Sequence, residues 1–345
     1  MDKPSNRRPA GDKAVRRVLA AFGLPSPREV HPAGGTASPK WLAASAQWRF
    51  VVRVRPAEFA GEDSIRFDHA VLQRLGEAGL PVPVPSVRPD GSTWVRLGGS
   101  VYEVLSWIEG RPFEEGDKEA ICAVGSFLGR FHSALGDNIP PGKAGQLRED
   151  HPDSLSPYLV RLRELASCED YRRQLGEVAR QIVYVRQRLD RELYRFLPHC
   201  VIHGDVHPGN VRFCAHRVAA VYDFDYLGVQ ARARDVSDGL ISFASRRSAP
   251  LVTDDIRSLT QPFFPDLDYC RLLLRGYQDL VPLADIEWDA LSLLMRSRWI
   301  QMRLRGSRKV PEDEKVGFVL DRFFEVVDWL DYRGSTFFDE LRSGL

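Results

Sequence analysis

The sequence predicts an α+β protein of two lobes, with a small lobe of mixed strands and helices at residues 1–110 and a larger, mainly helical lobe at residues 111–345. Short alternating apolar runs, which are typical of strands, gather in the first part of the chain. Amphipathic helical patterns dominate the second part. The segment Gly110-Arg-Pro-Phe contains two chain-breaking residues and marks the boundary between the lobes.

The small lobe is expected to hold a helix, a strand pair, a second helix and two further strands. Val15, Val18 and Leu19 share one face of the first helix. Ser64 is the predicted N-cap of the second helix, and Gly79 is its predicted end. The predicted bounds are 12–22 for the first helix, 50–55 for the second strand of the pair, 64–78 for the second helix, and 93–97 and 101–106 for the last strands.

The large lobe is expected to be helical with one short β-rich interruption. Apolar residues recur at helical spacing in five segments, namely 118–135, 155–164, 169–196, 291–304 and 316–331. Between the third and fourth of them, residues 200–222 alternate between strand-like runs and turn residues.

The composition is that of an ordinary globular protein without a global electric field. Hydrophobic residues make up 43% and charged residues 28%, and the formal net charge is +1. We therefore expect neither nucleic acid nor an anionic membrane as a partner. The five cysteines show no metal-ligand spacing, and no stretch has the length or apolarity of a signal peptide or a membrane span. The chain is expected to be cytoplasmic, and its oligomeric state stays open.

The β-rich interruption carries the most informative motif in the chain. It contains His203-Gly-Asp205, then Asn210 five residues after the aspartate, and then two strands that end at Asp223. The hairpin returns Asp223 close to Asn210. Phosphoryl transfer from ATP needs one carboxylate to orient the nucleophile, and an amide oxygen with a second carboxylate to hold Mg²⁺. Asp205, Asn210 and Asp223 supply these groups at the spacing of the kinase catalytic loop.

A metal-dependent hydrolase is a second interpretation of the same stretch. His203, Asp205, His207 and Asp223 are possible metal ligands, and the pattern His-x-Asp-x-His occurs in metallohydrolases. This interpretation leaves Asn210 without a role and does not explain the strands of the first lobe. A purely structural turn is the third interpretation. Kinase-type chemistry is favoured because it uses all three of the spaced residues.

The motif resembles that of the aminoglycoside phosphotransferase/choline kinase-like family, which has a protein-kinase-like fold. In that family the loop reads His-Gly-Asp where protein kinases read His-Arg-Asp, and the resemblance runs from about Val18 to Ala244. The resemblance implies ATP and Mg²⁺ as cofactors, Asp205 as the catalytic base, and Asn210 and Asp223 as Mg²⁺ ligands. His203 and His207 are implied as supports of the loop. Asp225 and Asp235 match further acidic positions, Asp225 as another support of the loop and Asp235 as a structural residue.

The first lobe is expected to bind the nucleotide. Gly34 and Gly35 precede the strand pair and would let backbone N–H groups approach a phosphate. The strand FVVRVRP resembles the family strand that carries the phosphate-binding lysine, and Arg53 stands at that position. Asp68 lies on the apolar face of the following helix, where an unpaired carboxylate would be costly. We therefore expect an Arg53–Asp68 ion pair, and the sequence leaves open whether Arg53 supports full activity.

The strand at 101–106 leads into the segment that matches the family's hinge. Backbone groups around Ser106, Trp107 and Ile108 are expected to face adenine, although Trp107 is equally well explained as a core residue. The sequence does not distinguish ATP from GTP. His132, in the helix that resembles the family's "LG..LH" segment, is expected to be structural.

The acceptor is expected to bind in the helical lobe, and the sequence does not identify it. An acidic cluster after Gly110 can attract a polyamine-like molecule, but a solvated helix N-terminus is the favoured explanation. Four arginines near Trp299 cover more than one side of their helix, which favours solvent exposure or ion pairs over a single anion pocket. The acidic residues are Glu114, Glu115 and Asp117, and the arginines are Arg296, Arg298, Arg303 and Arg305.

The function predicted from the sequence is therefore transfer of the γ-phosphoryl group of ATP to a hydroxyl of a small molecule of the aminoglycoside, choline or homoserine type. A protein serine/threonine kinase on the same fold is one alternative, but no Ala-Pro-Glu follows Asp223, and Asp-Phe-Asp replaces Asp-Phe-Gly. A non-catalytic nucleotide-binding module is the other alternative. Retention of Asp205, Asn210 and Asp223 argues against it.

Overall fold

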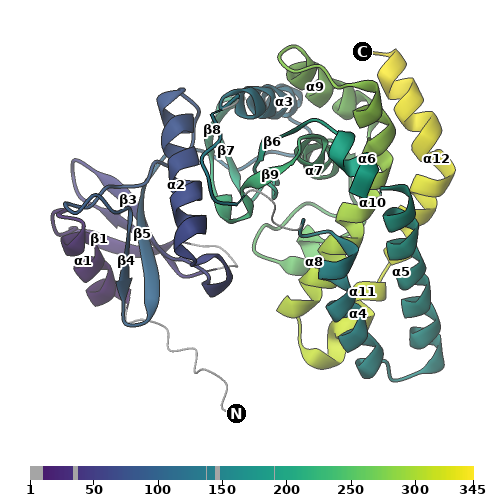
Figure 1. Ribbon diagram of the computed structural model, residues 1–345, viewed down its shortest axis with the longest axis horizontal. Coiled ribbons are helices and arrows are strands. Elements are labelled where there is room, and N and C mark those ends of the chain that lie inside the picture. The colour runs from purple at the N-terminus through teal and green to yellow at the C-terminus, as the bar shows by residue number, and fades with distance from the viewer. Residues whose placement is uncertain (1–10, 34–37, 137, 144–147, 190) are drawn as a thin grey trace.

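The computed structural model describes residues 11–33, 38–136, 138–143, 148–189 and 191–345. Its chain forms two lobes, a small one with a five-stranded sheet and a larger one built mainly of helices (Figure 1). This arrangement agrees with the order of elements expected from the sequence.

The small lobe is built on an antiparallel sheet with strand order β1-β2-β3-β5-β4. The strands are β1 (Glu29–Ala33), β2 (Lys40–Ala44), β3 (Arg49–Val54), β4 (Trp94–Leu97) and β5 (Ser100–Ser106). Strand β1 was not predicted. It contains Pro32 and lies at the sheet edge, where a residue without a backbone N–H is tolerated.

Two helices flank the sheet, and each packs into a different hydrophobic core. Helix α1 (Gly11–Ala21) buries Val15, Val18 and Leu19 against the strands in a cluster confined to the small lobe. Helix α2 (Glu62–Glu77) instead contributes its apolar face to the main core of the large lobe. Helix α2 therefore packs between the two lobes, as Figure 1 also shows.

The predicted N-cap of α2 is wrong. The helix starts at Glu62 with Gly61 as its N-cap, so Ser64 lies inside the first turn. Two acidic residues, Glu62 and Asp63, occupy the first turn, where negative charge interacts favourably with the helix dipole. The predicted end is correct, because Gly79 follows the helix with a φ of +73°.

The large lobe contains the expected helices with two changes. The segment predicted as one helix at 169–196 forms α5 (Glu169–Arg188) and α6 (Arg191–Phe196). The segment at 316–331 breaks at Arg322, which adopts a φ of +53°. The remaining helices are α3 (Lys118–Ser133), α4 (Pro152–Leu165), α7 (Ala233–Phe243), α8 (Ile256–Leu259), α9 (Leu267–Gln278), α10 (Asp285–Gly306), α11 (Lys315–Leu320) and α12 (Phe323–Ser343).

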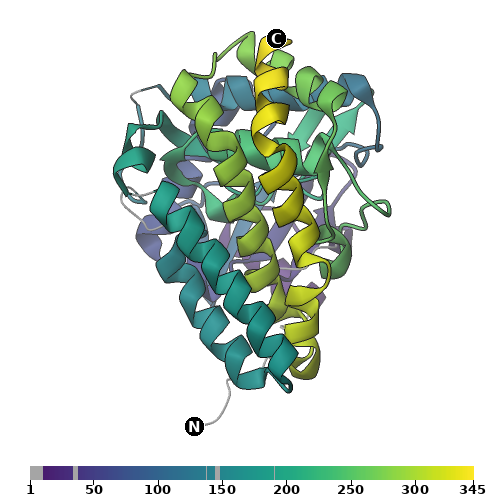
Figure 2. The ribbon, with the colours of Figure 1, turned by 90° about the vertical axis from the view of Figure 1, so that its right-hand side faces the viewer.

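The helices form the outer wall of the lobe, and the β-rich interruption lies at its inner side. Figure 2 shows the teal α5, the green α10 and the yellow α12 running side by side across this wall. Three two-stranded ribbons complete the lobe. They pair β6 (His199–Ile202) with β9 (Gly228–Ala231), β7 (Val211–Cys214) with β8 (Arg217–Val221), and β10 (Ser245–Arg246) with β11 (Phe264–Pro265).

Candidate active site

Strand β6 leads into a tight loop that presents Asp205 to the space between the lobes. Gly204 has a φ of +77°, and a Cβ at this position would lie 2.7 Å from the carbonyl oxygen of Tyr226. The loop is held from behind by Asp235 at the start of α7, which accepts hydrogen bonds from the backbone N–H groups of His203 at 2.7 Å and Gly204 at 2.8 Å. Asp235 is fully buried, so a polar loop is anchored inside the core.

His132 on α3 extends this anchor. Its Nε2 lies 3.2 Å from an oxygen of Asp235, and its Nδ1 lies 2.9 Å from the hydroxyl of Tyr277. Burial would raise the pKa of Asp235, but contact with His132 and with the loop N–H groups outweighs it, and the pKa lies below its usual value. The buried position and these two contacts agree with the structural role expected for His132.

The ring of His203 lies inside the loop and is fully buried. Its Nε2 donates to the carbonyl oxygen of Tyr222 at 2.9 Å, which leaves Nδ1 to accept the backbone N–H of Asp205 at 3.2 Å. The ring also packs on Phe224 with 4.6 Å between centroids. His203 therefore ties the catalytic loop to the end of β8.

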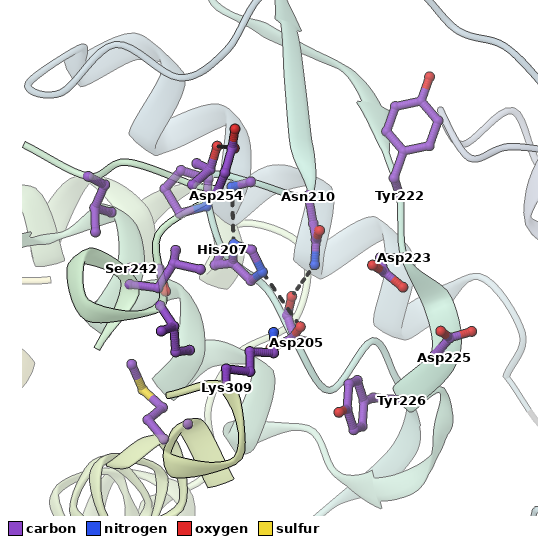
Figure 3. A pocket seen from close by; sticks show the side chains of 18 of the residues that line it. Asp205, His207, Asn210, Tyr222, Asp223, Asp225, Tyr226, Ser242, Asp254 and Lys309 are labelled. Carbon is purple, nitrogen blue, oxygen red and sulfur yellow. Dashed lines mark hydrogen bonds and ion pairs between the residues drawn. The ribbon is translucent and has the colours of Figure 1, made fainter. Parts of the chain in front are cut away.

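The carboxylate of Asp205 faces a guanidinium and an imidazole ring. Nη2 of Arg298 lies 2.6 Å from Oδ1, and Nε2 of His207 lies 3.5 Å from Oδ2. Burial alone would raise the pKa of Asp205, but His207 and Arg298 outweigh it and hold the pKa well below its usual value. Asp205 is therefore an anion at neutral pH. Figure 3 shows it between His207 and Asn210, with Lys309 beside it.

Arg298 was predicted to be exposed or to form an ion pair, and the second is correct. Its Nε lies 3.0 Å from Oδ1 of Asp238, which is 1% exposed, so one guanidinium connects two carboxylates. Burial raises the pKa of Asp238 to about 7, although Arg298 and Arg234 oppose the shift. Arg296 and Arg303 are also buried rather than solvated. Arg296 forms an ion pair with Asp331, and Arg303 donates a hydrogen bond to the carbonyl oxygen of Thr260.

Asn210 and Asp223 are brought together by the β7–β8 hairpin. The N–H of Tyr222 donates to the carbonyl oxygen of Asn210 at 2.8 Å, next to the register pair Val211↔Val221. The Nδ2 of Asn210 donates to the carbonyl of Asp205 at 3.0 Å, which directs Oδ1 away from the loop. Asp223 adopts a left-handed backbone with a φ of +64°.

The oxygen donors at this point fit Mg²⁺. The amide oxygen of Asn210 and the carboxylates of Asp205 and Asp223 are hard ligands, and all three residues line the same cleft. Burial would raise the pKa of Asp223, but Lys40 at 3.2 Å and Arg53 at 3.4 Å outweigh it, and the pKa lies below its usual value. Lys40 was not singled out from the sequence.

The predicted Arg53–Asp68 ion pair is wrong. Arg53 instead contacts Glu103 and Asp225, in addition to Asp223. Glu103 lies directly opposite Arg53 in the β3–β5 register, so it reaches the guanidinium first. A glutamate in the otherwise apolar strand VYEVLS was the sequence signal that pointed to a buried cationic partner.

Asp68 has two other partners. Arg55, which follows Arg53 by two residues and so projects from the same face of the sheet, contacts it. Nζ of Lys143, from the segment after α3, lies 2.8 Å from its Oδ1 and 3.0 Å from the carbonyl oxygen of Asp225. Burial raises the pKa of Asp68, although Lys143 and Arg55 oppose the shift. Helix α2 is thus tied to both lobes.

The hinge segment shows a contact that the sequence did not predict. The hydroxyl of Tyr222 accepts a hydrogen bond from the N–H of Ile108 at 3.0 Å and donates to its carbonyl at 2.5 Å. Ser106 bonds to Val84 through its N–H and its hydroxyl. Of the three hinge residues, Trp107 lines the cleft, together with Leu42 and Val51. Gly34 and Gly35 lie outside the described residues.

The cleft between the lobes has a volume of about 630 Å³, and residues of both lobes line it. Residues of strands β2 and β3 and Trp107 line one part of the cleft, and residues of α7, α10 and the segment around α8 line another. None of the acidic residues Glu114, Glu115 and Asp117 is among its lining residues. Asp117 caps α3 by accepting the N–H of Ala120, as the favoured explanation of that cluster expected.

Arg247, which lines the cleft, forms no ion pair with a carboxylate in the described part of the chain. Arg247 donates through Nη1 to the carbonyls of Ser242 and Ser245, each at 3.4 Å, and through Nη2 to that of Ile241. Its Nε has no hydrogen-bond partner there. Burial lowers the pKa of Arg247 to about 10, with Glu115 opposing the shift. The site therefore holds a positive charge that an anionic group of a ligand would compensate.

The chain is similar to known proteins over most of its length. The model of the phosphotransferase enzyme family matches residues 28–273. The homoserine kinase of Brucella anthropi is 26% identical over 297 residues, which cover 81% of this chain and 79% of that protein. No helix in the described ranges combines the length and apolarity needed to cross a membrane.

Two solved structures share the fold. An amicoumacin kinase in complex with AMP-PNP, Ca²⁺ and Ami superposes with a TM-score of 0.66 at 15% identity, over 91% of this chain and 93% of that one. The aminoglycoside phosphotransferase from Alicyclobacillus acidocaldarius superposes with a TM-score of 0.65 at 16% identity, over 98% and 97% of the two chains. These similarities confirm the predicted protein-kinase-like fold.

Proposed function

The chain belongs to the phosphotransferase enzyme family, and from this premise we propose that it phosphorylates the hydroxyl of a small amino acid alcohol of the homoserine type. Its class, a phosphotransferase that acts on a small-molecule hydroxyl with ATP as donor, follows from the family and its homoserine kinase relatives. The choice of acceptor and the roles of individual residues are our proposals.

The observation that carries the choice of acceptor is the uncompensated charge of Arg247. A carboxylate on the acceptor would form a charge-assisted hydrogen bond with the guanidinium, which lines the cleft and donates only to backbone carbonyls in the described structure. Choline has no such group, and an aminoglycoside would bring further positive charge to a wall that already carries Arg247, Arg298 and Lys309. Asp254, which lines the same end of the cleft, is a suitable partner for the ammonium group of an amino acid.

The residues of the catalytic loop have separate tasks in the proposed reaction. Asp205 accepts a hydrogen bond from the acceptor hydroxyl and so directs its oxygen at the γ-phosphorus. Because its pKa is low, Asp205 orients the hydroxyl rather than removing its proton in advance. The new O–P bond forms as the bond to the leaving ADP breaks, and the hydroxyl proton passes to Asp205. Mg²⁺, for which we propose Asn210 and Asp223 as ligands, supplies the charge that neutralises the phosphates.

The acceptor is tested by measuring ADP release from Mg·ATP with a set of related molecules. L-Homoserine is compared with 3-amino-1-propanol, which lacks the carboxylate, with 4-hydroxybutyrate, which lacks the ammonium group, and with choline and kanamycin. We expect homoserine to give the highest kcat/KM and Asp205→Asn to abolish turnover while Mg·ATP still binds. Preference for kanamycin or choline would contradict the proposed acceptor, and near-native turnover by Asp205→Asn would contradict the role of that residue.

The role of Arg247 is tested with its neighbour as the matched control. Arg247→Ala should raise the KM for homoserine on the order of tenfold to a hundredfold, as loss of a charge-assisted hydrogen bond predicts. The same change should leave the KM for 3-amino-1-propanol nearly unchanged. Arg246 is exposed and pairs with Asp266, so Arg246→Ala should leave both values unchanged. An equal effect of Arg247→Ala on both acceptors would show that it acts on folding or on the nucleotide instead.

A further inference from the structure

Two cations of the small lobe meet at Asp223, and they differ in how firmly they are held. Lys40 on β2 and Arg53 on β3 are direct partners in the antiparallel register, so their side chains leave the sheet side by side. Nζ of Lys40 lies 3.2 Å from Oδ2 of Asp223, and Nη1 of Arg53 lies 3.4 Å from Oδ1. Either cation is close enough to Asp223 to bind a nucleotide phosphate next to that carboxylate.

The guanidinium of Arg53 is held by ion pairs within the protein. Its side chain is 6% exposed and contacts the carboxylates of Glu103, Asp223 and Asp225. It borders a small void of about 40 Å³ and is not among the described residues that line the main cleft. Moving its guanidinium to a ligand would leave Glu103 and Asp225 as buried carboxylates short of a partner, which is costly.

Lys40 is placed differently. Its side chain is 17% exposed, and it lines both the main cleft and the small void. A lysine is a compact charge on a flexible stem, so it can change partners by rotating about its side-chain bonds. A divalent cation held by Asp223 would repel the ammonium group and so favour a new position for Lys40, where nucleotide phosphates would offer it a new partner.

We propose that Lys40, rather than Arg53, is the residue that binds the nucleotide phosphates. In the free protein it neutralises Asp223, and it exchanges this carboxylate for the phosphates when Mg·ATP binds. Arg53 stays in place as a positioning residue that holds Asp223 and Asp225. This inference rests on the proposed ATP-dependent function, and it moves the phosphate-binding cation from the strand where the sequence predicted it to the neighbouring strand.

The experiment is equilibrium binding to the full chain, with no acceptor present. Calorimetry measures the affinity for Mg·ATP and for adenosine, which has no phosphate, and electron paramagnetic resonance measures Mn²⁺ binding without nucleotide. Lys40→Ala should weaken Mg·ATP binding about tenfold to a hundredfold and leave adenosine binding unchanged. It should also strengthen Mn²⁺ binding, because a competing cation has left Asp223. Lys40→Arg should restore part of the Mg·ATP affinity, and Lys118→Ala, at an exposed position, should change nothing.

Three outcomes with the variants would overturn the proposal. Native Mg·ATP affinity in Lys40→Ala would exclude the phosphate contact, and equal losses for adenosine and Mg·ATP would show a structural role. A loss of Mg·ATP affinity in Arg53→Lys, with an unchanged unfolding midpoint and unchanged Mn²⁺ binding, would assign the contact to Arg53. If the unaltered protein binds Mg·ATP but phosphorylates no tested acceptor, the proposed acceptor fails while the assignment of Lys40 stands. If it does not bind Mg·ATP at all, both fail.

Discussion

Arg298 on α10 donates a hydrogen bond from Nη2 to Oδ1 of Asp205 at 2.6 Å, although the two residues are 93 positions apart in the chain. The helix that forms the acceptor side of the cleft is thereby tied to the carboxylate proposed to orient the acceptor. The same guanidinium reaches Asp238 at 3.0 Å, so the position of Asp205 depends on a charge shared between two aspartates.

Replacing Arg298 by lysine should lower turnover without weakening nucleotide binding. A lysine keeps the charge but cannot contact Asp205 and Asp238 at once, so Asp205 loses its fixed orientation. We expect kcat to fall on the order of a hundredfold, as for other small misplacements of a catalytic group, with little change in the KM for ATP. Arg296→Lys is the control, because Arg296 is buried on the same helix but pairs with Asp331. Equal losses of kcat in both variants would contradict the role assigned to Arg298.

Asp238 should make the stability of the protein depend on pH. Its pKa is about 7 in the folded protein and near 4 in the unfolded chain, so between these values the folded state holds a proton that the unfolded state has released. The contribution of Asp238 to the free energy of unfolding therefore falls as the pH rises from about 4 to 7. Relative to the unaltered protein, Asp238→Asn should gain stability over this range, by at most about 1.4 kcal/mol per pH unit.

Urea unfolding at several pH values between 4.5 and 8 measures this difference. Asp289→Asn is the matched control, since it makes the same chemical change at an exposed position of α10. A pH-independent difference for Asp238→Asn would mean that Asp238 is ionised throughout the range.

Gly204→Ala should destabilise the protein and disturb the catalytic loop. The backbone of Gly204 has a φ of +77°, and the new Cβ would lie 2.7 Å from the carbonyl oxygen of Tyr226. Gly79→Ala isolates the cost of the positive φ. Gly79 has a φ of +73°, but no described heavy atom lies within 4 Å of the position that a Cβ would take. We expect Gly79→Ala to cost about 1 kcal/mol of unfolding free energy and Gly204→Ala clearly more, with a loss of kcat as well. Equal costs would contradict the close approach of Tyr226.

The contact between Lys143 and Asp68 should be a strong interaction between the lobes. Removing Lys143 leaves a buried carboxylate with one partner fewer, so Lys143→Met should lower the free energy of unfolding by about 3–5 kcal/mol. In a double-mutant cycle with Asp68→Asn, the combined loss should be smaller than the sum of the single losses by about 1 kcal/mol or more. Additive losses would show that the two residues act independently, and Lys118→Met, at an exposed position, serves as the control.

The part of the site that the sequence predicted well is the part that is close together in the chain. Asp205, Asn210 and Asp223 belong to one loop and one hairpin, so their spacing and the turn between β7 and β8 already place them in one region. The kinase-like fold was predictable for a related reason, since the strand-rich and helix-rich halves are separated along the sequence. Local geometry decides both features, and local geometry follows directly from sequence spacing.

The partners of the buried charges were not predictable in this way. The pattern of α2 correctly indicated that Asp68 needs a cationic partner. The sequence alone does not show whether this partner is Arg53, Arg55 or Lys143. Which of them reaches Asp68 depends on how α2 lies across the sheet and on where the segment after α3 crosses it. Glu103 pairs with Arg53 because the register between β3 and β5 places the two residues opposite each other, and this register is a property of the whole sheet.

By itself, the sequence of this protein thus determined the fold class and the three residues proposed for the centre of the reaction. The tertiary structure decided which distant side chains contact them, namely Lys40 at Asp223 and Arg298 at Asp205, and it placed Arg247 on the wall of the same cleft. The physical reason is that hydrophobic periodicity specifies how each element folds and which face it buries. The pairing of charges across the cleft is specified by the packing of whole elements, to which residues far apart in the chain contribute together.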